Sequence, residues 1–248
     1  MARRPVADAD SSRSADGRGC GIDLYWLPLG AGGWFVRLNG RLYESILSRR
    51  QRRPALDLYH SALAVRLPEA CFVVENAWPI PDADGSPRGV VVEGPVGFAA
   101  LARFRVFRYE IRRWSNGLIG DVASAVESPR RVSTDPLVAR RLLDLVPRVP
   151  PLRWGRDDLG IGDMWNSNSV IAWLLARSGV RAEDIRPPQG GRAPGWRAGL
   201  ELAASPIARR RRVSRRPAGP RDLPARGSPG GSGRWVQETV KTVCIPPR

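Results

Sequence analysis

The segment from Trp165 to Ser178 constrains the fold most, because the helix it predicts is apolar on nearly every side. A helix without a polar stripe is buried in a protein core and needs other elements to cover it. Gly179 follows it, at the position where a left-handed residue commonly ends a helix. We therefore expect a core helix rather than a surface helix. Its large apolar members are Val170, Ile171, Trp173, Leu174 and Leu175.

The elements that cover this helix are predicted to be antiparallel strands. Residues 58–67 and Cys71–Ala77 are apolar runs with β-branched members on either side of Pro68–Ala70, which predicts a hairpin. Within Phe104–Trp114, apolar and charged side chains alternate, with Glu110 and Arg112 on the charged side, so we expect a half-buried sheet. Further strands are predicted at Leu24–Trp26, Trp34–Leu38 and Gly89–Glu93.

Two more helices complete the predicted set. Asp135 is a good N-cap, Pro136 suits the first helical position, and Pro147 ends an amphipathic run. Arg41–Gln51 predicts a short surface helix. The sequence thus predicts one α+β domain of about residues 21–203, in which an antiparallel sheet packs against the buried core helix.

The two ends of the chain have the composition of disordered segments. Residues 1–20 are polar without apolar periodicity, and residues 204–248 are rich in Arg, Pro and Gly. The formal net charge is +16, and residues 204–248 alone hold eleven basic and two acidic residues. Arg209–Arg212 could bind phosphates through counterion release. The other interpretation is a solvated tail, so we expect only weak nucleic-acid binding there.

Several classes of protein are not indicated by the sequence. The three cysteines, Cys20, Cys71 and Cys244, are far apart, and His60 is the only histidine, so we expect no metal site, no disulfide and no cofactor. No apolar run is long enough to span a bilayer, and residues 1–20 do not resemble a secretory signal. We expect a cytoplasmic protein.

Two segments carry the residues suited to proton-transfer chemistry. His60 lies within the predicted strand of residues 58–67, and Asn166-Ser167-Asn168-Ser169 opens the core helix. This order of a strand histidine followed by a polar helix start resembles the circularly permuted papain-like superfamily, which includes NlpC-type and lecithin retinol acyltransferase-like proteins. The resemblance covers about residues 60–178.

The resemblance implies a nucleophile at the helix start and a histidine base facing it. In those relatives a segment of the type Asn-Cys-Asn-Ser carries the nucleophile, and Ser167 occupies the cysteine position here. A serine hydroxyl needs a true general base, because the helix terminus alone does not ionise it. His60 and Ser167 are the implied catalytic residues, and Asn166, Asn168 and Trp165 are the candidate ligand-binding residues. Candidates for a third polar group are Glu75, Asn76 and Glu110.

Each of these residues also has a structural interpretation. Asn and Ser before an apolar helix are preferred N-caps, and a strand histidine is commonly bonded to a carbonyl group in a core. The loop Gly190–Trp196 combines arginine, glycine and a rigid aromatic ring, which suits either a ligand-binding edge or ordinary loop packing.

Three functions follow, in order of preference. The first is a degenerate, non-catalytic papain-like module that binds a peptide, lipid or amide ligand. The second is a serine hydrolase or acyltransferase that acts on an amide, ester or thioester through His60 and Ser167. The third is nucleic-acid binding through the Arg-rich tail.

Overall fold

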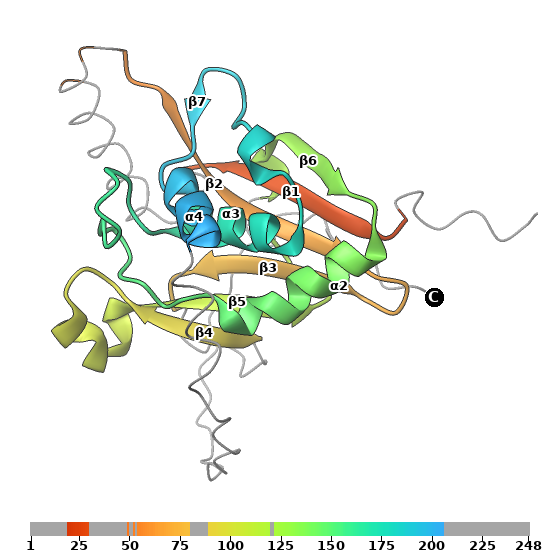
Figure 1. The fold of residues 1–248 in the computed structure, drawn as a ribbon, viewed down its shortest axis with the longest axis horizontal. Helices are drawn as coiled ribbons and strands as arrows, with labels where there is room; N and C mark the ends of the chain where they lie inside the picture. Colours follow the sequence, from red (N-terminus) through yellow and green to blue (C-terminus); the bar gives the residue numbers. More distant parts are fainter. Residues whose placement is uncertain are drawn as a thin grey trace, which may run out of the picture.

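The computed structural model describes residues 19–29, 49, 52, 54–79, 89–119 and 122–205. Six strands are followed by three helices, with a short seventh strand before the last helix (Figure 1). In chain order they are β1 (Gly21–Pro28), β2 (Asp57–Arg66), β3 (Cys71–Ala77), β4 (Val90–Pro95), β5 (Arg108–Ser115), β6 (Val126–Ser133), α2 (Pro136–Leu145), α3 (Ser167–Ser178), β7 (Gly191–Arg192) and α4 (Trp196–Ala204).

The strands form one sheet in the order β4-β5-β3-β2-β1-β6, and every neighbouring pair on this path is antiparallel. β7 adds a parallel pair to the start of β2, where Asp57 lies opposite Gly191. The predicted hairpin is confirmed as β2 and β3, with Arg66 opposite Cys71. The α+β architecture with an antiparallel sheet is therefore confirmed.

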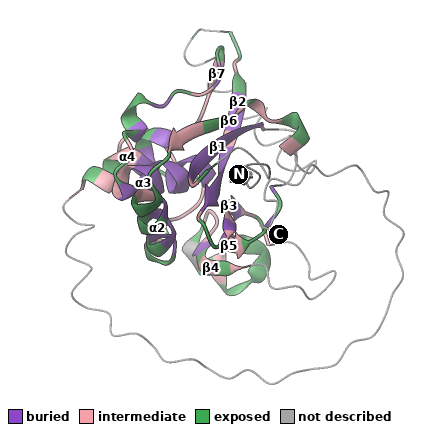
Figure 2. Cartoon of the chain, turned by 90° about the vertical axis from the view of Figure 1, so that its right-hand side faces the viewer, coloured by how far each residue is buried: buried purple, intermediate pink, exposed green. Residues whose placement is uncertain are grey.

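All three helices cover one face of the sheet, as the two perpendicular views agree (Figures 1 and 2). α3 lies in the middle of this layer and packs against α2, α4 and β2. Ten of its twelve residues are buried, so the predicted core helix is confirmed. It begins after Asn166 and ends at Gly179, whose φ of 105° is the left-handed conformation expected at that position.

The predicted N-terminus of α2 is also confirmed. The Asp135 carboxylate accepts a hydrogen bond from the Leu137 N–H at 2.8 Å, and Pro136 occupies the first turn. After Leu145 the chain continues as a 3-10 turn through Pro147. Leu142 and Leu145 on α2 face the same core as α3.

The second face of the sheet corrects one expectation. Its apolar members include Leu27, Ala62 and Val73, which form a separate buried cluster. Glu110 and Arg112 were expected on a solvated face, yet they are 2% and 1% exposed. The Arg112 guanidinium donates to the Glu110 carboxylate at 2.7 Å, and this pairing offsets part of the cost of burying both charges.

The cysteines correct a second expectation. Cys20 is free, whereas Cys71 is disulfide-bonded, and its partner lies outside the described residues. The prediction that no disulfide forms is therefore wrong. A wide spacing in the sequence does not prevent two cysteines from meeting in space, so spacing alone was a poor guide.

Several predictions fall outside the described residues. They are the strand at 34–38, nearly all of the helix at 41–51, the N-terminal segment before residue 19 and the Arg-rich tail after residue 205. Within the described part of the chain, no helix has the length and apolar character needed to cross a bilayer.

Replacing Gly199 on α4 with alanine should destabilise the fold, because the two helices α3 and α4 touch there through backbone. A Cβ at Gly199 would lie 2.2 Å from the Ser169 carbonyl oxygen. We expect Gly199→Ala to lower the free energy of unfolding by about 1 to 3 kcal/mol, measured by urea denaturation. Gly19→Ala is the matched control, because no atom lies within 4 Å of its new Cβ. Equal stabilities of the two variants would contradict this packing.

Candidate functional site

The polar residues at the start of α3 form a capping box. The Asn166 side chain accepts hydrogen bonds from the backbone N–H groups of Asn168 at 2.9 Å and Ser169 at 3.3 Å. The Ser169 hydroxyl in turn accepts one from the Asn166 N–H at 3.0 Å. These bonds satisfy N–H groups that the helix itself leaves unpaired. Asn166 and Ser169 therefore act on the helix terminus.

Asn168 connects this terminus to the rest of the molecule. Its amide nitrogen donates to the carbonyl groups of Tyr59 and Pro194, both at 2.9 Å. Its amide oxygen accepts from the Ser61 hydroxyl at 2.8 Å. The side chain is 1% exposed. Both amide protons and the oxygen are engaged within the protein, so Asn168 has no donor left for a ligand.

Trp165 is similarly enclosed. It is 1% exposed, and its indole N–H donates to the Tyr109 hydroxyl at 3.2 Å. Burial raises the pKa of Tyr109 far above its usual value, so this phenol stays neutral. The three predicted ligand-binding residues, Asn166, Asn168 and Trp165, thus lie where they organise the helix start and the core.

His60 and Ser167 are not brought together. Alternate residues of a strand point to opposite faces of a sheet. Tyr59 and Leu63 belong to the cluster under the helices, and Ser61 bonds to α3, whereas Ala62 and Ala64 belong to the cluster on the second face. His60 is in step with Ala62 and lies opposite Leu27, another member of the second-face cluster. Ser167 begins α3 on the helix side.

The environment of His60 disfavours its charged form. Burial lowers the pKa of the imidazole from 6.5 to about 4. A neutral imidazole is a possible base, but this one is separated from the helix start by the sheet. Among the described residues, no side chain forms a hydrogen bond with it. His60 therefore lacks the position that the catalytic interpretation requires. The bond to a carbonyl group that the structural interpretation expects is also not seen among the described residues.

The low pKa of His60 predicts an acid-sensitive contribution to stability. Above pH 6.5 the imidazole is neutral in both the folded and the unfolded chain, so it contributes no pH dependence. As the pH falls from 6.5 toward 4, only the unfolded chain takes up the proton. We expect a loss on the order of 2 kcal/mol by pH 5, absent from His60→Gln.

Both parts of this prediction are measurable. Urea denaturation of the two proteins at pH 7.5 and pH 5 gives the stability difference, and because His60 is the only histidine, its proton NMR signal can be assigned without ambiguity. A midpoint near 6.5 would show that the imidazole is solvated and would contradict the placement of His60.

Ser167 lacks the partner that a nucleophile needs. It is 6% exposed, and its hydroxyl has no hydrogen bond to another described side chain. We expect a fluorophosphonate probe, which reacts with activated serines, to leave Ser167 unlabelled, as judged by mass spectrometry of the intact protein and its peptides. Ser167→Ala serves as the blank. Labelling that is lost in Ser167→Ala would show that a base reaches this hydroxyl.

The predicted third polar groups are divided between the two faces. Glu75 and Glu110 lie with Arg112 on the second face. Burial raises the pKa of Glu75, against the opposing effect of Arg112. Asn76 lies opposite Ile111, on the face under the helices, and is 7% exposed. Among the described residues, neither of its amide atoms has a hydrogen-bond partner, so Asn76 is the one of these three candidates with unused polar capacity on the side of Ser167.

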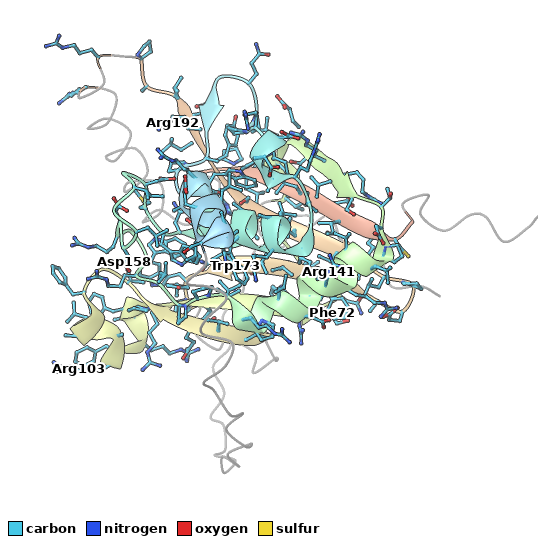
Figure 3. The ribbon with its side chains drawn as sticks, viewed as in Figure 1. Phe72, Arg103, Arg141, Asp158, Trp173 and Arg192 are labelled. Atoms are coloured by element: carbon cyan, nitrogen blue, oxygen red, sulfur yellow. The ribbon has the colours of Figure 1, made fainter. Side chains whose placement is uncertain are left out.

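A pocket of about 360 Å³ lies beside the α3 start, at the beginning of α4. We call it the α4 pocket. Its walls combine apolar side chains with three arginines. These residues come from the segments around β7 and α4. The residues on which the interpretation depends are Ile185, Trp196 and Leu200 for the apolar wall and Arg186, Arg192 and Arg197 for the charged wall. Figure 3 shows Arg192 at β7, above α4.

The α3 cap residues hold one wall of this pocket. Pro194 lines it, and its carbonyl oxygen accepts from the amide groups of both Asn166 and Asn168 at 2.9 Å. Asp163 also lines the pocket, but its carboxylate accepts from the N–H groups of Gly195 at 2.8 Å and Ala198 at 3.3 Å. Its charge therefore serves the α4 terminus, which leaves the arginines as the dominant charges of the pocket.

The arginines of the pocket differ in the hydrogen bonds and ion pairs that they already make within the protein. Arg186 donates to the carbonyl groups of Glu183 and Ile185. Arg197 lies 3.6 Å from the Glu201 carboxylate, and both side chains are more than half exposed, so this pair is weak. In the sequence, only the loop Gly190–Trp196 pointed to this pocket, and its composition suited either ligand binding or ordinary loop packing. Arg186 and Leu200 carried no signal of their own.

No protein-family model, curated protein or solved structure matches this chain. The resemblance to permuted papain-like proteins therefore stays a prediction. Within the described residues, no group of three or more His, Cys, Asp or Glu side chains is arranged to hold a metal ion.

Proposed function

We propose that this protein is a non-catalytic binding module, of papain-like permuted order, that holds a peptide carboxylate in the α4 pocket. The observation that carries the proposal is the combination of three arginines with an apolar wall beside the rigidly capped start of α3. A guanidinium binds a carboxylate through two parallel hydrogen bonds, which makes arginine well suited to this role.

The shape of the pocket favours the end of a peptide over a bare ion. A volume of about 360 Å³ lies at the lower end of the range of small-ligand sites. Trp196 and Leu200 would cover an apolar side chain, while Arg186 and Arg197 would face the adjacent carboxylate. A peptide terminus carries both groups on one residue, whereas a simple anion would leave the apolar wall unused.

The role of the α3 cap follows from this proposal. Asn166 and Asn168 bind the Pro194 carbonyl and thereby hold the pocket wall in place. They support the ligand site indirectly. In the papain-like superfamily this helix start carries a nucleophile, whereas here it would hold the pocket wall in position.

The hydrolase alternative has no such support, because His60 and Ser167 lie on opposite sides of the sheet. The nucleic-acid alternative depends on the tail, which lies outside the described residues.

Peptide binding through the α4 pocket should depend on a free carboxylate. A library of short peptides with apolar last residues is titrated against the full chain by calorimetry, and each ligand found is remade with an amidated terminus. We expect amidation to weaken binding at least tenfold, which corresponds to about 1.4 kcal/mol. We expect the double variant Arg186→Ala/Arg197→Ala to weaken binding by a similar factor.

Arg148→Ala is the matched control for the loss of charge. Arg148 is exposed in the 3-10 turn after α2, which contacts β4, and it does not line the α4 pocket. We expect this variant to bind the free peptide within twofold of the unchanged protein. Equal affinity for free and amidated peptides, or an equal loss in Arg148→Ala, would contradict the proposal.

A further inference from the structure

The connection between β4 and β5 is a protrusion with an unusual surface. It contains two 3-10 turns, η1 (Ala99–Arg103) and η2 (Arg105–Phe107). We call these turns, together with Phe98 and Phe104, the β4–β5 tip. The tip extends beyond the end of the sheet, and Arg103 lies at its outer end (Figures 1 and 3). It lies on the part of the molecule formed by β4 and β5, away from β7 and the α4 pocket.

Large apolar side chains are concentrated on this tip and face solvent. Phe98 is 70% exposed, Val106 is 60% exposed and Phe104 is 48% exposed. Phe107 adds a fourth at 37%. Exposed apolar residues scattered singly are normal on a protein surface, but four within ten residues form a patch, and such patches mark interaction sites.

The charges of the tip are all positive. Between Gly94 and Tyr109 the sequence contains Arg103, Arg105 and Arg108 and no acidic residue. The Arg103 guanidinium lies 4.7 Å from the centre of the Phe104 ring. Arg108 and Arg105 pair with the carboxylates of Glu93 and Glu110, at the base of the tip, at 3.2 and 3.6 Å. No carboxylate of the described residues pairs with Arg103, so its charge remains available to a negative partner.

The backbone of the tip is suited to a nonaqueous surrounding. The N–H groups of Leu101, Phe104 and Phe107 each donate to the carbonyl group three residues earlier, at 3.0 Å. The Arg108 side chain donates to the Ala102 carbonyl at 2.5 Å. Polar backbone groups that are already bonded cost much less to remove from water than free ones.

We propose that the β4–β5 tip inserts into the interface of an anionic lipid bilayer. Aromatic and aliphatic side chains would enter the boundary between headgroups and acyl chains, and Arg103 would remain at the level of the lipid phosphates. The positive charge of the whole chain, formally +16, would attract it to such a surface.

A lipid surface accounts for the tip better than a nucleic acid or a second copy of the chain. Single strands bind in positively charged grooves where bases stack on rings. On the tip, Arg105 and Arg108 already pair with carboxylates, and Val106, at 60% exposed, offers no ring for a base. A second copy packed on the same tip would place Arg103 of both chains at one contact, and like charges there are unfavourable.

The full chain is tested for co-sedimentation with vesicles of phosphatidylcholine alone and of phosphatidylcholine mixed with phosphatidylserine. We expect binding to the mixed vesicles, and at least a tenfold loss in Phe98→Ser/Val106→Ser. Leu137→Ser is the matched control, because Leu137 is 68% exposed on α2 and lies outside the tip. Both variants keep the Arg-rich tail, so a difference between them reports on the tip alone. Circular dichroism confirms that both are folded.

Insertion is measured directly with a tryptophan probe. We expect bilayers of brominated lipids to quench the added fluorescence of Phe98→Trp and to leave that of Leu137→Trp unchanged. Equal binding of the serine variants, no binding of the unchanged chain to mixed vesicles, or no quenching of the Phe98→Trp probe would overturn the proposal. So would an oligonucleotide complex or a dimer that Phe98→Ser/Val106→Ser abolishes while vesicle binding persists.

Discussion

The side-chain amide of Asn168 joins three parts of the chain that lie far apart in the sequence. It bonds to Ser61 and Tyr59 on β2 and to Pro194 before α4, while its own backbone N–H is capped by Asn166. Buried amides are costly unless every donor and acceptor is paired, and this one is fully paired. The arrangement therefore fixes the start of α3 against the sheet and against the wall of the α4 pocket at the same time.

This interaction also determines which side of β2 faces the helix layer. Ser61 must point to α3 to reach Asn168, so its neighbour His60 must point to the second face. A one-residue shift of the strand would reverse both directions and would also remove Leu63 and Val65, which are fully buried, from the core under the helices. The same constraint that secures the core thus separates the only histidine from Ser167, and it leaves the helix start with a structural role.

Much of the fold could be predicted from local pattern, and the site largely could not. The all-round apolar character of residues 170–175 predicted the core helix, and the apolar runs around Pro68 predicted the hairpin, because burial and turn chemistry act locally. The face of the sheet to which His60 points depends on the register of a whole strand. The neighbouring Ser61 did not indicate that face in the sequence. The α4 pocket combines Arg186 with Leu200, which only the tertiary fold brings together. Glu110 and Arg112 were misjudged because a buried ion pair looks like a solvated face in sequence.

A double-mutant cycle between Ser61 and Asn168 tests the central claim most directly. Urea denaturation of Ser61→Ala, Asn168→Ala and the double variant yields the interaction energy of the two side chains. The account predicts a coupling of about 1 to 2 kcal/mol, as expected for a buried hydrogen bond whose loss leaves a polar group unpaired. A coupling below about 0.3 kcal/mol, within the additivity of independent sites, would show that the two side chains do not meet and would contradict the placement of α3 on the sheet.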